Sequence, residues 1–131
     1  MKDNFLFLIS LFDIYGNLLS ENERESFEQY YCDDLSLSEI SENLGITRQG
    51  VRDNIVRAEK SLLEYDKKLN LKTIFDDINN KIKDAKKYID EEKYESAKEL
   101  LSKIEIWKEE SNGTIKWFIW KTEWSFVKIQ K

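Results

Sequence analysis

The sequence feature that most constrains the fold is a short turn, Leu-Gly-Ile-Thr at residues 44–47, between two segments with helical patterns. Gly45 suits the end of a helix, because glycine adopts a left-handed backbone there at little cost. Thr47 suits the start of the next helix, since its hydroxyl can accept a hydrogen bond from a free backbone N–H. Two helices joined by such a turn predict a helix-turn-helix unit.

Two capping boxes predict where the preceding helices begin. Ser20 with Glu23, and Ser36 with Glu39, each have the spacing at which both side chains satisfy free backbone N–H groups. A further helix is expected at the start of the chain, where apolar residues recur every three or four positions: Phe5, Leu8, Phe12, Tyr15 and Leu19. This first helix is apolar on most sides, so the core or another subunit must cover it.

The helix after Thr47 has one apolar and one polar side. Its predicted buried stripe consists of Val51, Ile55, Ala58 and Leu62. The opposite half carries Gln49, Arg52, Asp53, Val56, Arg57 and Lys60, and Arg48 and Asn54 flank the stripe. The chain contains no proline and four glycines, which favours helices throughout. We therefore predict an all-α fold, in which an N-terminal apolar helix precedes the helix-turn-helix unit.

In the second half of the chain, the sequence pattern predicts a helical hairpin followed by a tryptophan-rich tail. A spacing of three and four continues from Thr73, slips by five residues between Ile89 and Tyr94, and resumes, so a turn is expected near Asp90 to Lys93. The last stretch is rich in tryptophan and fits no clean period. It could be a docked tail, a partner-binding segment, or an artificial or frameshifted addition. The predicted domains are 1–70 (helix-turn-helix), 71–110 (hairpin) and 111–131 (aromatic tail).

Composition excludes several functions. The chain has no histidine and a single cysteine, Cys32, so the usual structural zinc sets and histidine-based catalysis are excluded. No phosphate-cradling glycine loop is present. Asp3 and Asp13 interrupt the apolar start, which argues against a signal peptide, and no apolar run is long enough for a membrane span. We expect a cytoplasmic protein that is not an enzyme and has no cofactor and no metal.

The basic residues after the turn indicate nucleic-acid binding. In helix-turn-helix proteins, the N-terminal half of the second helix enters the major groove of DNA. Arginine can bond guanine, glutamine or asparagine can bond adenine, and Arg57 and Lys60 would meet phosphate. The predicted nucleic-acid-binding residues are Thr47, Arg48, Gln49, Arg52, Asn54, Arg57 and Lys60. The alternative is that such a tri-helical unit serves as a packing or protein-docking module.

The charge distribution limits how strong this binding can be. Residues 1–70 hold 8 basic and 14 acidic side chains and residues 71–131 hold 13 and 12, for a net charge of −5. Strong duplex binders usually carry a basic surplus, because phosphate neutralisation provides most of their non-specific affinity. Asp53 also lies on the predicted exposed face, where it would repel phosphate or accept from a cytosine amine. Binding should therefore be modest and salt-sensitive, or cooperative through a dimer.

Residues 18–62, "LLSENERESFEQYYCDDLSLSEISENLGITRQGVRDNIVRAEKSL", resemble region 4 of bacterial sigma factors, which reads the −35 promoter element. The chain is more similar to the YlxM-type helix-turn-helix family, through "FLISLFDIYGNLLS", "YYCDDLSLSEI" and "TRQGVRDNI". It departs from that family at Gly50, where alanine is common, and at Arg52, where tyrosine is common. The resemblance covers about residues 5–70 well, the hairpin only in outline, and the aromatic tail not at all.

This resemblance implies an accessory or regulatory role in the signal recognition particle pathway of protein targeting. Its partners would be duplex DNA or, alternatively, the RNA of the particle. DNA is favoured, because the narrow major groove of double-stranded RNA admits a recognition helix poorly. The competing interpretation is a non-catalytic adaptor that docks on components of the targeting particle. Because the first helix and the hairpin both offer apolar surface, we also expect a homodimer with these helices at its interface.

Overall fold

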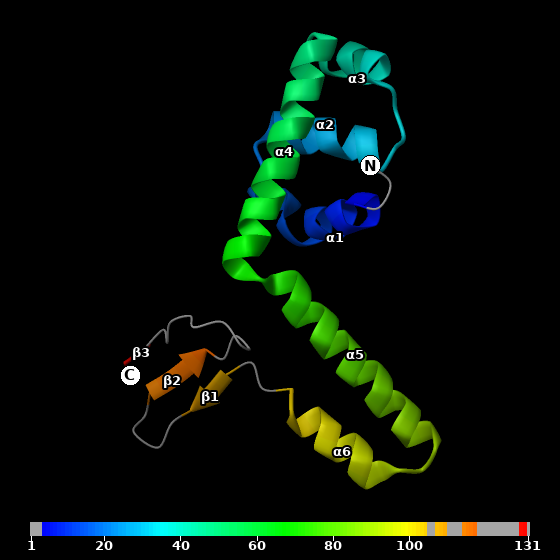
Figure 1. Cartoon of the computed structure of the whole chain (residues 1–131), viewed down its shortest axis with the longest axis vertical. Coiled ribbons are helices and arrows are strands. Elements are labelled where there is room, and N and C mark those ends of the chain that lie inside the picture. Colours follow the sequence, from blue (N-terminus) through cyan, green and yellow to red (C-terminus); the bar gives the residue numbers. More distant parts are fainter. Residues whose placement is uncertain (1–3, 105–106, 110–113, 118–128, 131) are drawn as a thin grey trace. The chain divides into compact units, whose positions relative to one another are not determined.

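The computed structural model describes residues 4–104, 107–109, 114–117 and 129–130, and its elements are shown in Figure 1. The chain forms two compact units, Met1–Lys72 and Thr73–Lys131. This one division falls close to the predicted limit at residue 70. The three-part division at 70 and 110 remains our proposal.

The first unit is a helical domain built around one long helix. Its elements are α1 (Phe5–Tyr15), a 3₁₀ turn (Gly16–Leu18), α2 (Glu21–Tyr31), α3 (Leu37–Leu44) and α4 (Arg48–Leu69). Figure 1 shows α1, α2 and α3 beside α4, with α3 near its N-terminal end and α1 nearer its C-terminal end. The predicted all-α helix-turn-helix arrangement is confirmed in this unit.

The helices begin and end at the residues that the sequence indicated. Both capping boxes are formed, Ser20 with Glu23 at the start of α2 and Ser36 with Glu39 at the start of α3. Gly45 ends α3 with a left-handed backbone, at φ 65°. Thr47 then caps α4, and its Oγ1 accepts a hydrogen bond of 3.0 Å from the Gly50 N–H. The turn is therefore fixed by bonds between residues at most five positions apart.

Two apolar clusters hold the first unit together, and α4 contributes to both. The larger cluster consists of Leu8, Leu11, Tyr15, Leu19, Phe27, Ala58 and Leu62. The smaller one consists of Ile40, Val51 and Ile55. All four residues of the predicted α4 stripe are thus buried. The apolar first helix is largely covered within the same unit; its exposed apolar side chains are Phe5 (38%) and Leu6 (77%).

A tyrosine hydroxyl ties the end of α4 to the start of α5 (Leu71–Asp90). Asn70 ends α4 in the left-handed conformation, at φ 53°. The fully buried Tyr15 donates a hydrogen bond of 2.8 Å to Asp66 Oδ1 and accepts one of 3.1 Å from the Leu71 N–H. The same Asp66 oxygen accepts from the Lys72 N–H. Two free N–H groups at the start of α5 are satisfied in this way.

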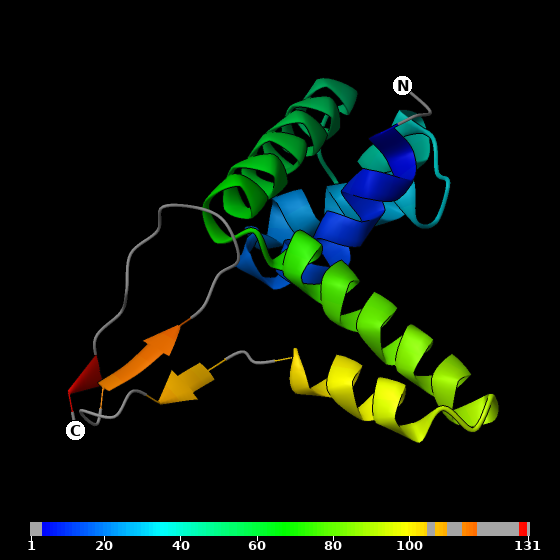
Figure 2. The same cartoon turned by 60° about the horizontal axis from the view of Figure 1, so that its bottom comes forward.

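The second unit begins with a helical hairpin. α5 and α6 (Tyr94–Ser102) run side by side in Figure 2, and the turn between them lies where the sequence placed it. Glu92 adopts the left-handed conformation there, at φ 61°. Among the described side chains of this unit, only Ala85 and Ala97 are buried, while five larger ones are exposed: Phe75, Ile82, Ile89, Tyr94 and Leu101.

Short strands follow α6: the first lies within residues 71–110, which were predicted as a helical hairpin, and the other two lie in the tail, for which the sequence predicted no secondary structure. They are β1 (Trp107–Glu109), β2 (Thr114–Trp117) and β3 (Ile129–Gln130), and they form an antiparallel sheet in that order. β1 and β2 pair Trp107 with Trp117, and β2 and β3 pair Ile115 with Ile129. β-Branched and aromatic residues favour strands, which explains this departure from purely helical structure. Much of the predicted aromatic tail lies outside the described residues.

Candidate nucleic-acid interface

The N-terminal half of α4 is held in place by α3 behind it. Ile40 of α3 is fully buried against Val51 and Ile55 of α4. With these two residues facing the core, the opposite side of the helix faces solvent. Arg48, which starts α4, lies 3.5 Å from Ser38 Oγ of α3, so a side-chain contact also crosses the turn. The packing thus leaves the outer side of the first turns of α4 exposed to solvent.

Three of the predicted base-contacting residues lie on this exposed surface: Arg48, Gln49 and Arg52. Asp53 is exposed beside them and accepts a hydrogen bond of 2.9 Å from Gln49 Nε2. This bond joins residues four positions apart on the helix, and it uses one of the two amide donors of Gln49. A base contact through that donor requires Gln49 to leave Asp53. Arg48 and Arg52 therefore contribute the surface's free positive charge.

Asn54 is not part of the exposed surface, although the sequence placed it among the contact residues. It is only 7% exposed, and its Nδ2 donates a hydrogen bond of 3.2 Å to the hydroxyl of Ser26 on α2. Its Oδ1 accepts from Arg57 Nη2 at 2.5 Å. Because Asn54 is buried and its amide is bonded to Ser26 and Arg57, the proposed contact set does not include it. The sequence could not reveal this, because tertiary packing is what brings Ser26 of α2 opposite Asn54.

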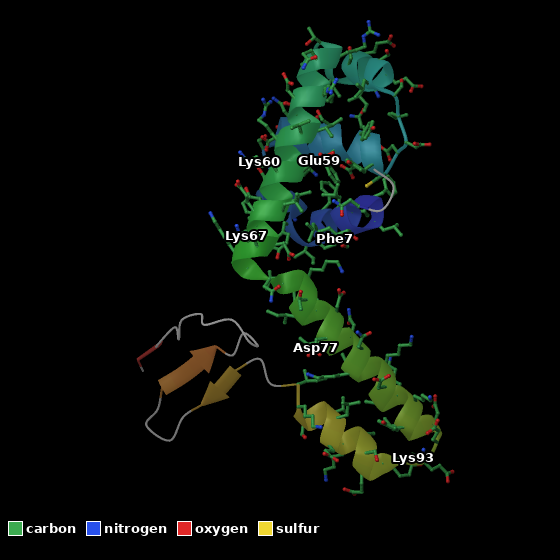
Figure 3. The ribbon with its side chains drawn as sticks, in the orientation of Figure 1. Phe7, Glu59, Lys60, Lys67, Asp77 and Lys93 are labelled. Atoms are coloured by element: carbon green, nitrogen blue, oxygen red, sulfur yellow. The ribbon has the colours of Figure 1, made fainter. Side chains whose placement is uncertain are left out.

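Arg57 and Lys60 both remain accessible, but they differ in their surroundings. Arg57 bonds Asn54, and its Nε lies 3.5 Å from Glu23 Oε1, with 59% of its side chain exposed. Lys60 is exposed and lies on the side of α4 away from α1, whereas Glu59 lies toward α2 (Figure 3). Arg57 is thus a positioned cation and Lys60 a solvated one. Thr47 is used as the helix cap.

A groove that the sequence did not reveal lies beside Arg52. It has a volume of about 680 Å³ and is lined by apolar and aromatic residues of α1 to α4, among them Leu8, Tyr30, Leu37 and Val56. Tyr31 donates a hydrogen bond of 2.5 Å to Glu59 at this groove. Burial and then this bond raise the pKa of Tyr31 far above its ordinary value. The groove therefore combines apolar walls with one arginine and one bonded carboxylate.

Features of other kinds of site are weak in the described part of the chain. Among the described residues, no group of three histidine, cysteine or acidic side chains lies close enough together to hold a metal ion. Partial burial, and then the carboxylates of Glu28 and Asp33, raise the pKa of the Cys32 thiol. Raising a thiol pKa reduces its thiolate fraction and hence its reactivity. None of the described helices combines the length and the apolar character that a membrane span requires.

Comparison with known proteins agrees with this architecture. A family profile described as "UPF0122: Putative helix-turn-helix protein, YlxM / p13 like" matches residues 2–104. A UPF0122 protein of Thermoanaerobacter sp. strain X514 is 50% identical over 90 residues, covering 69% of this chain and 77% of the relative. UPF0122 proteins of Halalkalibacterium halodurans and Bacillus cereus strain AH187 are 39% and 41% identical, covering 80% and 72% of this chain and 94% and 88% of their own lengths. The chain therefore belongs to the UPF0122 family of YlxM-like helix-turn-helix proteins.

Proposed function

We propose that this protein is a non-catalytic regulatory or accessory protein that binds duplex DNA through the first turns of α4. The observation that carries the proposal is the geometry of α4. Thr47 caps the helix, Val51 faces the core, and Arg48 and Arg52 face solvent on the other side. An exposed basic N-terminal half of the second helix is what the major groove of DNA receives in helix-turn-helix complexes. The resemblance to sigma factor region 4 supports the same surface.

The proposed mode of binding is weak for a single chain and depends strongly on salt. Arg48 and Arg52 contact base edges, and Arg57 and Lys60 contact phosphate. The net charge of −5 opposes general attraction to a polyanion, so few phosphate contacts support the complex. DNA is proposed over RNA because the A-form major groove is too narrow for α4. We propose the cytoplasm as the location of this role and the signal recognition particle pathway as its setting; the family resemblance supports both.

The test is an unbiased selection of nucleic acids at low and moderate salt, followed by binding measurements on the selected sequence. The Arg48→Ala/Arg52→Ala double variant should lose sequence preference, and its binding should depend less on salt. Lys67→Ala/Lys68→Ala is the matched control, because it removes the same charge from exposed positions in the last turn of α4. If the wild-type protein binds neither duplex DNA nor the particle RNA at low salt, the proposed function is wrong.

One observation favours a second function, that of an adaptor for a protein partner. Val56 is 54% exposed on the outer side of α4, at the edge of the apolar groove, and Phe5 and Leu6 are exposed on α1. Exposed apolar side chains beside a groove are typical of protein-binding surfaces. Pull-down with the purified GTPase of the targeting particle and its RNA, compared with bare RNA, separates the two functions. Retention that survives high salt and ribonuclease favours the adaptor.

We also propose that two chains associate, chiefly through the hairpin. The apolar stripe of α5 leaves Phe75, Ile82 and Ile89 exposed, at spacings of seven residues. This is the spacing by which two helices pack along a seam. Since α1 is largely covered within its own unit, α5 offers more apolar surface for this contact than α1 does. Sedimentation at micromolar concentration tests this, and a well-folded monomer would refute it.

A further inference from the structure

The feature behind this inference is a pair of polar side chains inside an apolar contact. Ser26 of α2 and Asn54 of α4 are 0% and 7% exposed, and they are the two buried polar residues of the described chain. Their hydrogen bond of 3.2 Å crosses the contact between α2 and α4, the most extensive one in the first unit. Replacing both partners of such a bond by apolar groups of similar shape is often nearly neutral for stability. Stability alone therefore does not explain a polar pair here.

The pair does have one effect at the surface, which is to hold Arg57. With its amide nitrogen bonded to Ser26, Asn54 turns its carbonyl oxygen to Arg57 Nη2, at 2.5 Å. On the other side, Glu23 Oε1 lies 3.5 Å from Arg57 Nε. An arginine has five N–H donors, and Asn54 takes one of them. The guanidinium is thus oriented from within the domain while 59% of its side chain stays exposed.

We infer that Ser26 and Asn54 are positioning residues that preorganise Arg57 as a fixed anchor for a nucleic-acid phosphate. Ordering a long side chain before binding removes an entropic cost from the complex, so the contact becomes stronger without any new bond to the ligand. Glu23 opposes this anchor, because its carboxylate competes with phosphate for the same guanidinium. The inference rests on the proposed function, and it assigns α2 a part in an interface that the sequence confined to α4.

The experiment measures binding to one duplex over a series of salt concentrations, with variants that separate charge from positioning. Arg57→Ala removes the phosphate contact, so the salt slope should fall by about one. Ser26→Ala/Asn54→Leu leaves the charge and removes the positioning. Its affinity should fall about 3–10-fold, because Arg57 must then be ordered on binding. The salt slope should stay unchanged, because the charge of Arg57 is retained. Arg57→Lys, at an exposed site where folding is not at risk, should behave in the same way.

Lys60→Ala serves as the matched comparison. Lys60 is exposed on the same helix, and no hydrogen bond or ion pair joins it to the described residues. The salt slope of Lys60→Ala should also fall by about one, but substitutions at Ser26 and Asn54 should not alter the contribution of Lys60. Urea unfolding must show that Ser26→Ala/Asn54→Leu is folded; if it is not, Arg57→Lys decides. If the wild-type protein binds duplex and the charge-retaining variants bind equally well, the inference alone is overturned. If the wild-type protein does not bind duplex, the proposed function falls together with it.

Discussion

Replacing Tyr15 with phenylalanine removes a single oxygen atom from the centre of the first unit. The ring keeps its place among Leu8, Leu11 and Leu62, so packing changes little. The hydroxyl, however, donates to Asp66 at 2.8 Å and accepts from the Leu71 N–H at 3.1 Å. Without it, Asp66 loses one donor and Leu71 keeps an N–H with no acceptor. We therefore expect Tyr15→Phe to lower the free energy of unfolding markedly, at the junction of α4 and α5.

The size of this loss follows from the bond to Asp66. A hydrogen bond to a charged group contributes about 1.5–3 kcal/mol to stability. Burial, and then the bond to Asp66, raise the pKa of Tyr15 to about 12 from its ordinary value near 10. This raised pKa means that the fold disfavours the tyrosinate, so it bears on stability at high pH.

The same bond predicts how stability depends on pH. Because the folded-state pKa of Tyr15 lies above the unfolded value, its contribution is fully present below about pH 10 and is lost as the pH rises toward 12. The wild-type protein should therefore lose stability over this range faster than Tyr15→Phe does. The difference between the two proteins should be constant between pH 7 and pH 9 and should shrink above that.

Urea unfolding followed by circular dichroism measures the loss, and amide exchange at Leu71 reports it locally. Tyr65→Phe is the matched control, since it removes the same atom from a residue whose hydroxyl makes only a long bond of 3.4 Å to the Leu18 carbonyl oxygen. Tyr65→Phe should cost less than about 0.5 kcal/mol, as weakly bonded surface groups usually do. Equal effects of the two substitutions, or an unchanged exchange rate at Leu71, would refute the reasoning.

Three further changes test the cap, the helix and the charge around the candidate interface. Thr47→Ala should cost about 1 kcal/mol by removing the acceptor for the Gly50 N–H, and Thr47→Ser should restore it, as urea unfolding will show. Gly50→Ala should raise the free energy of unfolding by up to about 1 kcal/mol through helix propensity, if Thr47 Oγ1, 3.2 Å from the new Cβ, can shift slightly. A lower melting temperature would show that it cannot. Glu23→Gln keeps the capping box but removes the charge beside Arg57, so duplex affinity should rise a few-fold; a fall would contradict the competition between Glu23 and phosphate.

The elements that could be predicted from the sequence are those fixed by local bonds. Ser20 with Glu23 and Ser36 with Glu39 each satisfy backbone groups three residues away, so spacing alone reveals them. Gly45 is also a local feature, because glycine adopts a left-handed backbone at little cost, and its φ is 65°. The buried stripe of α4 followed from helical periodicity, because one side of this helix must face a core.

What could not be predicted depends on partners distant in sequence. Asn54 lies at the edge of the apolar stripe, and periodicity cannot decide whether an edge residue faces solvent or a neighbour. Ser26, 28 positions away, decides it by bonding the amide. The bond between Tyr31 and Glu59 also spans 28 positions and is equally invisible in the sequence. The sequence therefore predicted the charged residues of the candidate interface, Arg48 and Arg52, but not the contacts that orient Arg57.

The division of the core into two clusters has a consequence for the motions of the domain. The eight-residue helix α3 is too short to persist alone in water, and Ile40 is its only fully buried apolar side chain. The larger apolar cluster contains no residue of α3, so α1, α2 and the second half of α4 can stay folded while α3 detaches. We expect the amides of α3 to exchange with solvent faster than those of α4 after Ala58, through local rather than global opening. The helix that supports the candidate interface is then also the least stable part of the domain, and a ligand that holds α4 and α3 together would slow that opening.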